Sequence, residues 1–457
     1  MNTFFRVASL AILASGSAAA MAADKVDGRW DAQLVRGDNV VPFRLDISGS
    51  GSSLKGTLYD GFRPYEDTTS ASFKDGKLLL NIEHYLTTIT ATFQDGKLVG
   101  NVSAQNRENH ADYGFVATRH VDSPAAAVNA PSIAGSWEIP LDTPTSKGEK
   151  AFRFIVEQKG AEVAASILRV DGDTGAYSGT FKDGKWVLSH YDGSRPGVIV
   201  VTPAQDGTLE VLQRVDRPQQ PVANTSAPAA TAYGDSAPDG RYAPKLVAYR
   251  TEVARAKGLP EPENYLTHTT ARDPKEKFTF NFPDVEGKLV SNEDPHFKGK
   301  VVLAIVTGTW CPNCHDEAQY LVELDKKYRD KGLSIVALDF EEVEQQASLT
   351  RVHAFVKQYG VKYPYLIAGA PAEMWEKVPQ LVNLNTWPAT VFVGRDGTVK
   401  AVHSGFASPA SVAFNAQLKK EFTERIEQLL AESATTRTDV TLSTPPGAGN
   451  ELVASLP

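Results

Sequence analysis

Short runs of alternating hydrophobic and polar residues fill the first half of the chain, over residues 24–216. The runs at residues 40–47 and 77–83 are examples of this alternation. Asp-Gly dipeptides such as Asp75-Gly76 separate many of the runs. An Asp-Gly pair between two alternating runs is a strong local signal for a β-hairpin. The pattern therefore predicts an all-β region built of antiparallel hairpins.

The all-β region contains an internal repeat. A Gly-x-Trp sequence that ends at Trp30 recurs at Trp137, an offset of 137 − 30 = 107 residues. The sequence FKDGK recurs at nearly the same offset, 181 − 73 = 108 residues. We therefore predict two β modules of seven or eight strands each, at residues 23–122 and 131–216, folded as small antiparallel barrels or sandwiches. We expect both tryptophans to belong to the cores of these modules.

The pattern changes after the second module. Residues 217–240 are rich in Pro, Ala, Ser and Gly and predict a flexible linker. Residues 246–256 are expected to form a short helix that leads into the next domain. Beyond it, apolar runs alternate with stretches of helical periodicity, and a hairpin and a helix close the domain. This order predicts an α/β fold over residues 241–433. We predict strands at 301–307, 333–340, 363–369, 389–394 and 399–405, and helices at 312–328, 349–359 and 412–430.

Two cysteines lie where the apolar strand at 301–307 gives way to a helix. They are Cys311 and Cys314, the only cysteines of the 457-residue chain. The unpaired N–H groups and the dipole of a helix N-terminus stabilise a thiolate at such a position. A second thiol three residues later provides what thiol–disulfide exchange requires. We expect Cys311 to be the nucleophile and Cys314 the resolving thiol, with Cys314 the less exposed of the two.

The sequence GTWCPNCHDEA, with Trp387-Pro388 further along the chain, resembles the thioredoxin superfamily, and within it the TlpA/ResA-like extracytoplasmic thiol–disulfide oxidoreductases. The resemblance extends over roughly residues 278–430. It implies a thioredoxin fold for this part of the chain. It also implies that Pro388 is a cis-proline that faces the disulfide, in a loop that pairs with the substrate chain. We expect Trp310 to cover the disulfide and Trp387 to narrow the access of substrates.

An acidic residue lies one helical turn after the second cysteine. The resemblance implies that this residue, Glu317, lines the active site, where it can accept the proton of the resolving thiol. A solvated glutamate favoured by the helix dipole is the alternative interpretation. Ile305 stands where ordinary thioredoxins have a buried aspartate that accepts a proton. Because this acceptor is absent, we expect Glu317 to be more important for proton transfer. We expect His315 to lie on the surface, and Asp339, at the end of the strand at 333–340, to be a minor further candidate.

Other chemistries use the same motif. Cys311 to His315 spells C-x-x-C-H, the attachment pattern of c-type haem. A thioredoxin fold would leave no room for a porphyrin there, and Met374 is the only methionine beyond the first 22 residues. A structural zinc ion needs four ligands, and the sequence has no second C-x-x-C or H-x₃-H pair. A copper(I) site made by the two thiolates stays open. Our preferred interpretation predicts no cofactor and no metal.

The N-terminal residues have the features of a secretory signal. Arg6 precedes a short apolar stretch, and Ala20-Met21-Ala22 is a cleavage site of the A-x-A type. The apolar stretch is too short to span a bilayer. We therefore predict a signal peptide at residues 1–22, a periplasmic or secreted location and no stable membrane insertion. The net charge of −8 and the lack of a basic run argue against nucleic acid as a partner. Residues 434–457 are expected to be disordered.

These observations predict a multidomain extracytoplasmic thiol–disulfide oxidoreductase whose partners are protein thiols and disulfides. The resemblance implies a reductase that receives electrons from a membrane thiol donor. The alternative is an envelope binding protein. In that case the β modules would hold a ligand or a partner, and the thioredoxin-like domain would be a redox switch or a copper site.

Overall fold

The computed structural model describes most of the chain. The described residues are 26–37, 39–106, 109–121, 130–173, 175–214 and 245–432. The predicted signal peptide at 1–22, the linker at 217–240 and the tail at 434–457 lie outside them. The chain forms two compact units. The first contains Met1–Tyr59, Arg63–Pro124 and Tyr191–Pro196, and the second contains Asp60–Phe62, Ala125–His190 and Gly197–Pro457.

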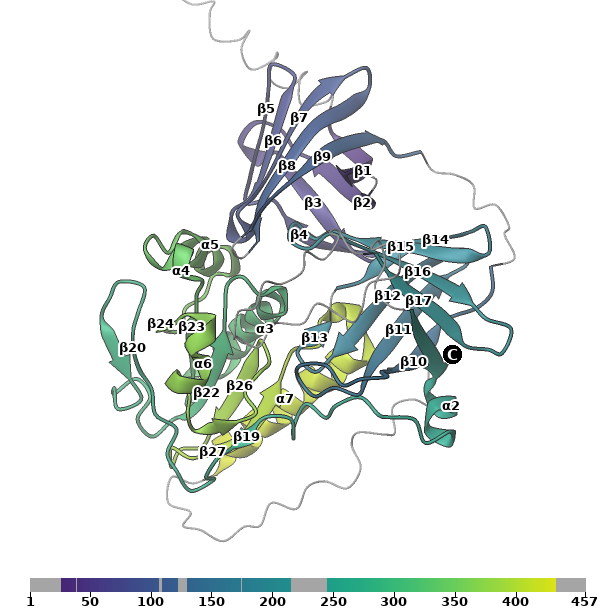
Figure 1. The fold of residues 1–457 in the computed structure, drawn as a ribbon. Helices are drawn as coiled ribbons and strands as arrows, with labels where there is room; N and C mark the ends of the chain where they lie inside the picture. The colour runs from purple at the N-terminus through teal and green to yellow at the C-terminus, as the bar shows by residue number, and fades with distance from the viewer. Residues whose placement is uncertain are drawn as a thin grey trace, which may run out of the picture. The chain divides into compact units, whose positions relative to one another are not determined.

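The first β module is an open antiparallel sheet of nine strands that curves into a half-barrel (Figure 1). The strand order is β4-β3-β2-β1-β9-β8-β7-β6-β5. Asp75 and Gly76 both have positive φ in the β5–β6 turn, which is the type I′ geometry that an Asp-Gly pair favours. The strands are β1 (Gly28–Arg36), β2 (Asn39–Ser48), β3 (Lys55–Asp60), β4 (Arg63–Asp67), β5 (Ser70–Lys74), β6 (Lys77–Ile82), β7 (Thr87–Gln94), β8 (Lys97–Asn106) and β9 (Asn109–Arg119), with short 3₁₀ turns η1 (Gly51–Ser53) and η2 (Glu83–Tyr85).

The second β module closes into a barrel of eight strands, because β11 pairs with both β10 and β12. A two-residue strand, β13, extends the sheet by pairing with β12. Apolar side chains, including Phe154, Trp186 and Ile199, pack together inside the barrel. The strands are β10 (Gly135–Pro140), β11 (Ala151–Lys159), β12 (Glu162–Arg169), β13 (Gly172–Asp173), β14 (Tyr177–Lys182), β15 (Lys185–His190), β16 (Gly197–Pro203), β17 (Leu209–Gln213) and β18 (Leu246–Arg250).

The helix expected at residues 246–256 is wrong over its first half. Leu246–Arg250 is strand β18, which pairs with β10 and β17, and only Thr251–Ala256 is helical (α2). Ala248 is fully buried in the barrel core. The hydrogen bonds that β18 forms with β10 and β17 outweigh the local helix propensity of this segment, because strand formation depends on neighbours that are distant in sequence.

The predicted duplication is supported by matching contacts in the two β modules. The indole nitrogen of Trp30 donates to Val26 O, and that of Trp137 donates to Ile133 O, both at 2.9 Å. An arginine from the last strand of each module stacks on the tryptophan of that module. Arg119 in β9 lies 4.2 Å from the Trp30 ring centroid, and Arg250 in β18 lies 3.9 Å from that of Trp137. Both tryptophans are buried, as expected of core residues. The first module has nine strands rather than seven or eight.

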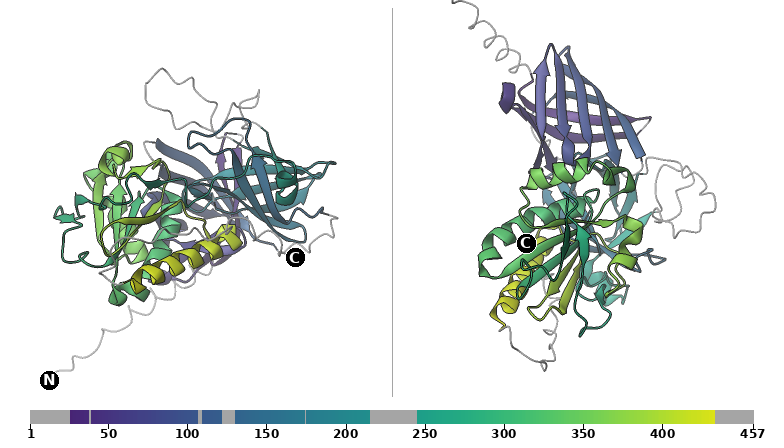
Figure 2. Two further views of the ribbon diagram at one scale, coloured as in Figure 1. Left: turned by 90° about the horizontal axis from the view of Figure 1, so that it is seen from below. Right: turned by 90° about the vertical axis from the view of Figure 1, so that its left-hand side faces the viewer.

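The C-terminal part has a five-stranded sheet of order β24-β23-β22-β26-β27, in which β22, β23 and β24 are parallel. This is the predicted thioredoxin fold, and α7 lies along one face of the sheet (Figure 2). The elements are β19 (Thr270–Ala271), β20 (Asn281–Pro283), β21 (Leu289–Ser291), β22 (Val301–Thr307), α3 (Pro312–Tyr328), η3 (Arg329–Lys331), β23 (Leu333–Phe340), α4 (Val343–Gln346), α5 (Thr350–Tyr359), β24 (Tyr365–Gly369), η4 (Pro371–Glu373), α6 (Met374–Lys377), β25 (Leu381–Val382), β26 (Ala389–Val393), β27 (Val399–Ser404), η5 (Pro409–Ser411) and α7 (Ala413–Ala431).

All seven residues of β22 are buried, because both faces of this strand are covered. Leu303 and Ile305 pack with side chains of α3, α5 and α7, whereas Val302 and Val306 pack with residues 278–297 and 374–384. Two barrel residues, Ile155 and Leu168, belong to the same apolar cluster as α3 and α7. The closed barrel, which has its own interior core, therefore also packs against the thioredoxin fold through these two side chains within the second unit. Within the described residues, the helices are too short or too polar to cross a membrane.

Candidate active site

The two cysteines lie at the junction of β22 and α3. Cys311 is the N-cap residue of α3, and Pro312 occupies the first helical position, where its missing N–H costs nothing. Cys314 N donates to Cys311 O at 3.0 Å, which closes the first turn of the helix. Both residues are free thiols, with Cys311 5% exposed and Cys314 1% exposed. The order of exposure agrees with the expectation, although both side chains are buried.

The buried thiol of Cys314 is held in its protonated form. Burial raises the pKa of Cys314 well above its ordinary value, and a hydrogen bond with the Cys311 thiol raises it further. Hydrogen bonds with the Thr307 side chain and the Gly308 backbone partly offset these effects. The Cys311 thiol also donates to Trp387 O at 3.6 Å. The two sulfurs are therefore in hydrogen-bond contact with each other, and the outer one touches the loop before Pro388.

The predicted aromatic and proline residues gather around Cys311. The peptide bond between Trp387 and Pro388 is cis. The rings of Trp310 and Trp387 meet edge to face, with 5.1 Å between their centroids, and Trp310 Nε1 donates to Phe340 O at 2.9 Å. Both tryptophans are half-buried. The structure thus brings together the three residues that the sequence selected for contact with a substrate.

Glu317 is a buried residue and not a solvated one. Its side chain is 1% exposed and comes from the second turn of α3, one turn after Cys314. Thr390 in β26 donates a short hydrogen bond to Glu317 Oε1, whereas Oε2 has no hydrogen-bond partner among the residues that the structure describes. Burial raises the pKa of Glu317 to about 8, and the bond from Thr390 only partly opposes this. The carboxyl group is therefore protonated near neutral pH.

The expectation that His315 lies on the surface is wrong. His315 is fully buried and bonds to Tyr359 OH at 2.9 Å and to Thr309 O at 2.7 Å. It also packs against Phe355 in an edge-to-face contact. His315 lies on the face of α3 that packs against the core, and a buried polar side chain needs hydrogen-bond partners within the protein.

A buried ionic network lies next to this histidine. Arg351 bonds to Glu341 Oε1, to Glu342 Oε2 at 2.7 Å and, through Nε, to the Thr309 hydroxyl at 3.0 Å. Asp339 is fully buried at the end of β23, and burial together with nearby Glu341 raises its pKa well above the ordinary range. Within the described residues, no three His, Cys, Asp or Glu side chains are grouped in a way that could hold a metal ion.

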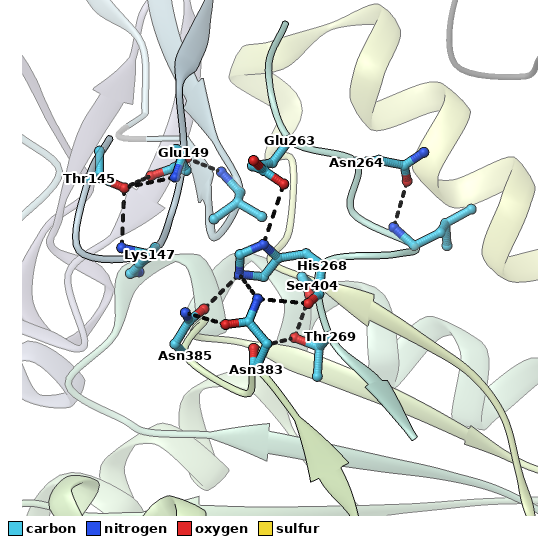
Figure 3. Close-up of polar contacts among 12 residues, drawn as sticks. Thr145, Lys147, Glu149, Glu263, Asn264, His268, Thr269, Asn383, Asn385 and Ser404 are labelled. Atoms are coloured by element: carbon cyan, nitrogen blue, oxygen red, sulfur yellow. Dashed lines mark hydrogen bonds and ion pairs between the residues drawn. The ribbon is translucent and has the colours of Figure 1, made fainter. Parts of the chain in front are cut away.

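Hydrogen bonds from a polar cluster hold the loop that carries Trp387 (Figure 3). The sequence did not predict this cluster. His268 Nε2 bonds to Asn385 Oδ1 at 2.7 Å, and Asn383 Nδ2 donates to His268 O at 2.8 Å. Ser404 donates to Thr269, which in turn donates to Asn383 O. These partners lie more than 100 residues apart, and no local motif marks them. Thr390 was also missed; its place at the start of the predicted strand that follows Pro388 was the available signal.

The fold and this site define a class: an α/β protein of thioredoxin type, with a C-x-x-C pair at a helix N-terminus opposite a cis-proline. The family model described as Redoxin matches residues 234–417. "Thioredoxin-like protein YneN" of Bacillus subtilis (strain 168) is 32% identical over 128 residues, which cover 27% of this chain and 69% of that protein. The chain belongs to this thioredoxin-like family through its C-terminal part.

Other similar proteins carry the name "Thiol-disulfide oxidoreductase ResA". The protein of that name from Bacillus thuringiensis (strain Al Hakam) is 35% identical over 125 residues, or 27% of this chain. The chain spans 65% of the length of that relative. Among solved structures, a DsbF homologue from Corynebacterium diphtheriae is 20% identical, with a TM-score of 0.28, and the match covers 35% of this chain and 92% of the other.

Proposed function

We propose that this protein is an extracytoplasmic thiol–disulfide oxidoreductase that reduces protein disulfides through Cys311 and Cys314. The observation that carries the proposal is the stacked pair of thiols at the N-terminus of α3, facing the cis peptide bond at Pro388. The ResA relatives support the same chemistry by name. The predicted signal sequence at residues 1–22 supports the location.

The reaction takes two exchange steps. The Cys311 thiolate attacks one sulfur of the substrate disulfide, so that a mixed disulfide forms and the other substrate sulfur leaves as a thiolate. Cys314 then loses its proton and attacks Cys311 Sγ. The mixed disulfide breaks, and the second substrate thiolate is released. The substrate gains two electrons, and the protein is left with an internal disulfide between Cys311 and Cys314.

We assign Glu317 the role of proton partner for the dithiol. Its pKa of about 8 lies below that of the buried Cys314 thiol, whose pKa burial raises well above the ordinary value, so the ionised carboxylate can take up the proton that this thiol loses. The hydrogen bond from Thr390 fixes one carboxyl oxygen and leaves Oε2 for this exchange. We further assign Trp310, Trp387 and Pro388 to substrate contact, because they surround the outer thiol.

The direction of electron flow is open to direct measurement. We propose reduction, with electrons supplied by a membrane thiol donor, in keeping with the resemblance of the motif. A dithiol potential near that of thioredoxin, about −270 mV, would support this direction. A value near that of DsbA, about −120 mV, would reverse the assignment to an oxidase.

Trapping of a defined substrate tests the mechanism. The Cys314→Ser variant cannot resolve the mixed disulfide, so it should accumulate a covalent adduct with insulin that a reducing agent releases. The matched control is the double variant Cys311→Ser/Cys314→Ser, which should form no adduct. Adduct formation by Cys311→Ser instead would reverse the assigned order of the two thiols. The absence of any adduct would contradict the proposed function.

A further inference from the structure

The second β module reaches the dithiol through the tip of one hairpin. We call residues 170–173, which are the turn after β12 together with β13, the barrel tip. Asn313, which lies between the two cysteines, donates from Nδ2 to Asp171 O at 2.8 Å. Phe406 N, in the loop after β27, donates to the same oxygen at 3.3 Å. Gly172 forms a parallel β-bridge with Phe406. A segment distant in sequence thus adds backbone pairing directly beside the C-x-x-C turn.

The contact is close enough to require glycine on both sides. A Cβ atom on Gly172 would collide with Phe406 O and would lie 2.8 Å from Asn313 Nδ2. A Cβ atom on Gly405 would collide with Val170 O. Both glycines have positive φ, +120° and +72°, which other residues adopt only with strain. The backbone of the barrel tip therefore lies directly against the backbone at this edge of the active site.

A buried carboxylate fixes the barrel tip to the thioredoxin fold. Asp173 is 1% exposed and accepts hydrogen bonds from Ser408 N at 2.9 Å, from Ser408 Oγ at 2.7 Å and from Ser411 Oγ at 2.5 Å. The donors surround both carboxylate oxygens, so the buried charge is well compensated.

The barrel supports the other side of the same tip. Glu149 Oε1 accepts from Val170 N at 2.7 Å, and Lys147 forms an ion pair with Asp171. Lys147 and Glu149 lie together in the loop between β10 and β11 (Figure 3). The tip is therefore fixed by hydrogen bonds and an ion pair to the barrel on one side and by hydrogen bonds to the thioredoxin fold on the other.

We infer that the barrel tip determines which disulfides reach Cys311, and that the docked tip selects small or extended disulfides over those of folded proteins. This inference rests on the proposed function. Exchange requires a substrate sulfur to reach the Cys311 sulfur, and the rate depends on that access. Cys311 is only 5% exposed. The barrel tip covers one side of the C-x-x-C turn, where it contacts Asn313 of the turn and Phe406 of the neighbouring loop. A narrow substrate can still approach along Trp310 and Trp387, whereas a folded protein collides with the barrel.

Asp173→Ala tests the inference, because it removes the three hydrogen bonds that the Asp173 carboxylate accepts from Ser408 and Ser411. The kcat/KM for reduction of native insulin should rise about tenfold, since weakening several hydrogen bonds increases the undocked population by that order. The kcat/KM for 5,5′-dithiobis(2-nitrobenzoate), a small disulfide, should change less than twofold. Lys182→Ala, on an exposed position of the same barrel, is the matched control and should change neither value.

Two further measurements show whether the Asp173→Ala variant is folded and whether a milder change has the same effect. Hydrogen exchange should accelerate in peptides of the barrel tip and stay unchanged in β22, which shows that the variant is folded. Ser411→Ala removes one of the three bonds to Asp173, together with the contact of Ser411 Oγ with Ser166 Oγ in β12, and should shift the ratio of the two activities in the same direction by a smaller factor. An equal change in both activities, or a selective fall in insulin reduction, would overturn the inference. Failure of the wild-type protein to reduce the small disulfide through Cys311 would instead contradict the proposed function.

Discussion

Replacing Glu317 with glutamine should change how stability depends on pH around the active site. The folded protein keeps the Glu317 carboxyl protonated up to a pKa of about 8, whereas the ordinary value is 4.5. The stabilisation that comes from the buried neutral carboxyl is fully present below pH 4.5 and is lost as the pH rises through 8. Glutamine is neutral at every pH, so the variant should not show this loss.

The size of the effect follows from the shift in pKa. Each pH unit between the two pKa values costs about 1.4 kcal/mol of stability, because one proton is bound by the folded state and not by the unfolded state. Between pH 5.5 and 7.5 the wild type should therefore lose about 2.7 kcal/mol relative to Glu317→Gln. The amide oxygen of glutamine can still accept the hydrogen bond from Thr390, so the variant keeps that contact.

Hydrogen exchange of peptides from β22 and α3, measured on the reduced protein, gives the local free energy of opening at each pH. Glu323→Gln is the matched control on α3, because its side chain is 68% exposed and surface substitutions usually change stability by less than about 0.5 kcal/mol. A constant difference between wild type and Glu317→Gln over this pH range would mean that Glu317 is already ionised. The burial argument and the proposed role in proton exchange would then both be wrong.

Two other substitutions probe the surroundings of the site. Thr390→Val removes the hydrogen bond that lowers the pKa of Glu317, so infrared titration of the carboxyl stretch should place that pKa above its wild-type value; an unchanged or lower pKa would contradict the contact. Arg351→Met leaves Glu341 and Glu342 buried without their cation and should cost roughly 3–5 kcal/mol in thermal unfolding. Neutralising both glutamates in the same variant should restore most of this loss, and a cost near zero for the single change would contradict the network.

The regular part of the thioredoxin fold could be predicted from the sequence because its signals are local. Residues 301–307 form an unbroken apolar run, and the structure makes them the strand β22 that is covered on both faces. The strand predicted at 333–340 coincides with β23, and Cys311, Cys314 and Pro388 lie where the motif placed them. The Asp-Gly turns of the β modules belong to the same kind of evidence, since a two-residue turn needs no information from elsewhere in the chain.

The features that were missed depend on partners far along the chain. His315 is buried because Tyr359 and Thr309 meet it from other elements, and nothing beside His315 in the sequence indicates this. The contact between Asn313 and Asp171 joins residues 142 positions apart. Strand β18 was taken for a helix for the same reason. Its edge partners lie before residue 214, across the segment that we predict to be a linker.

The most direct test of the central claim is a redox titration of Cys311 and Cys314 in the full-length protein. The protein is equilibrated in glutathione buffers of graded potential, quenched, alkylated and analysed by mass spectrometry of the peptide that carries both residues. The account predicts that both thiols become protected together in one two-electron transition, with the loss of two hydrogens that marks an internal disulfide. Thiols that stay open to alkylation at every potential, or that oxidise one at a time to glutathione adducts, would contradict it.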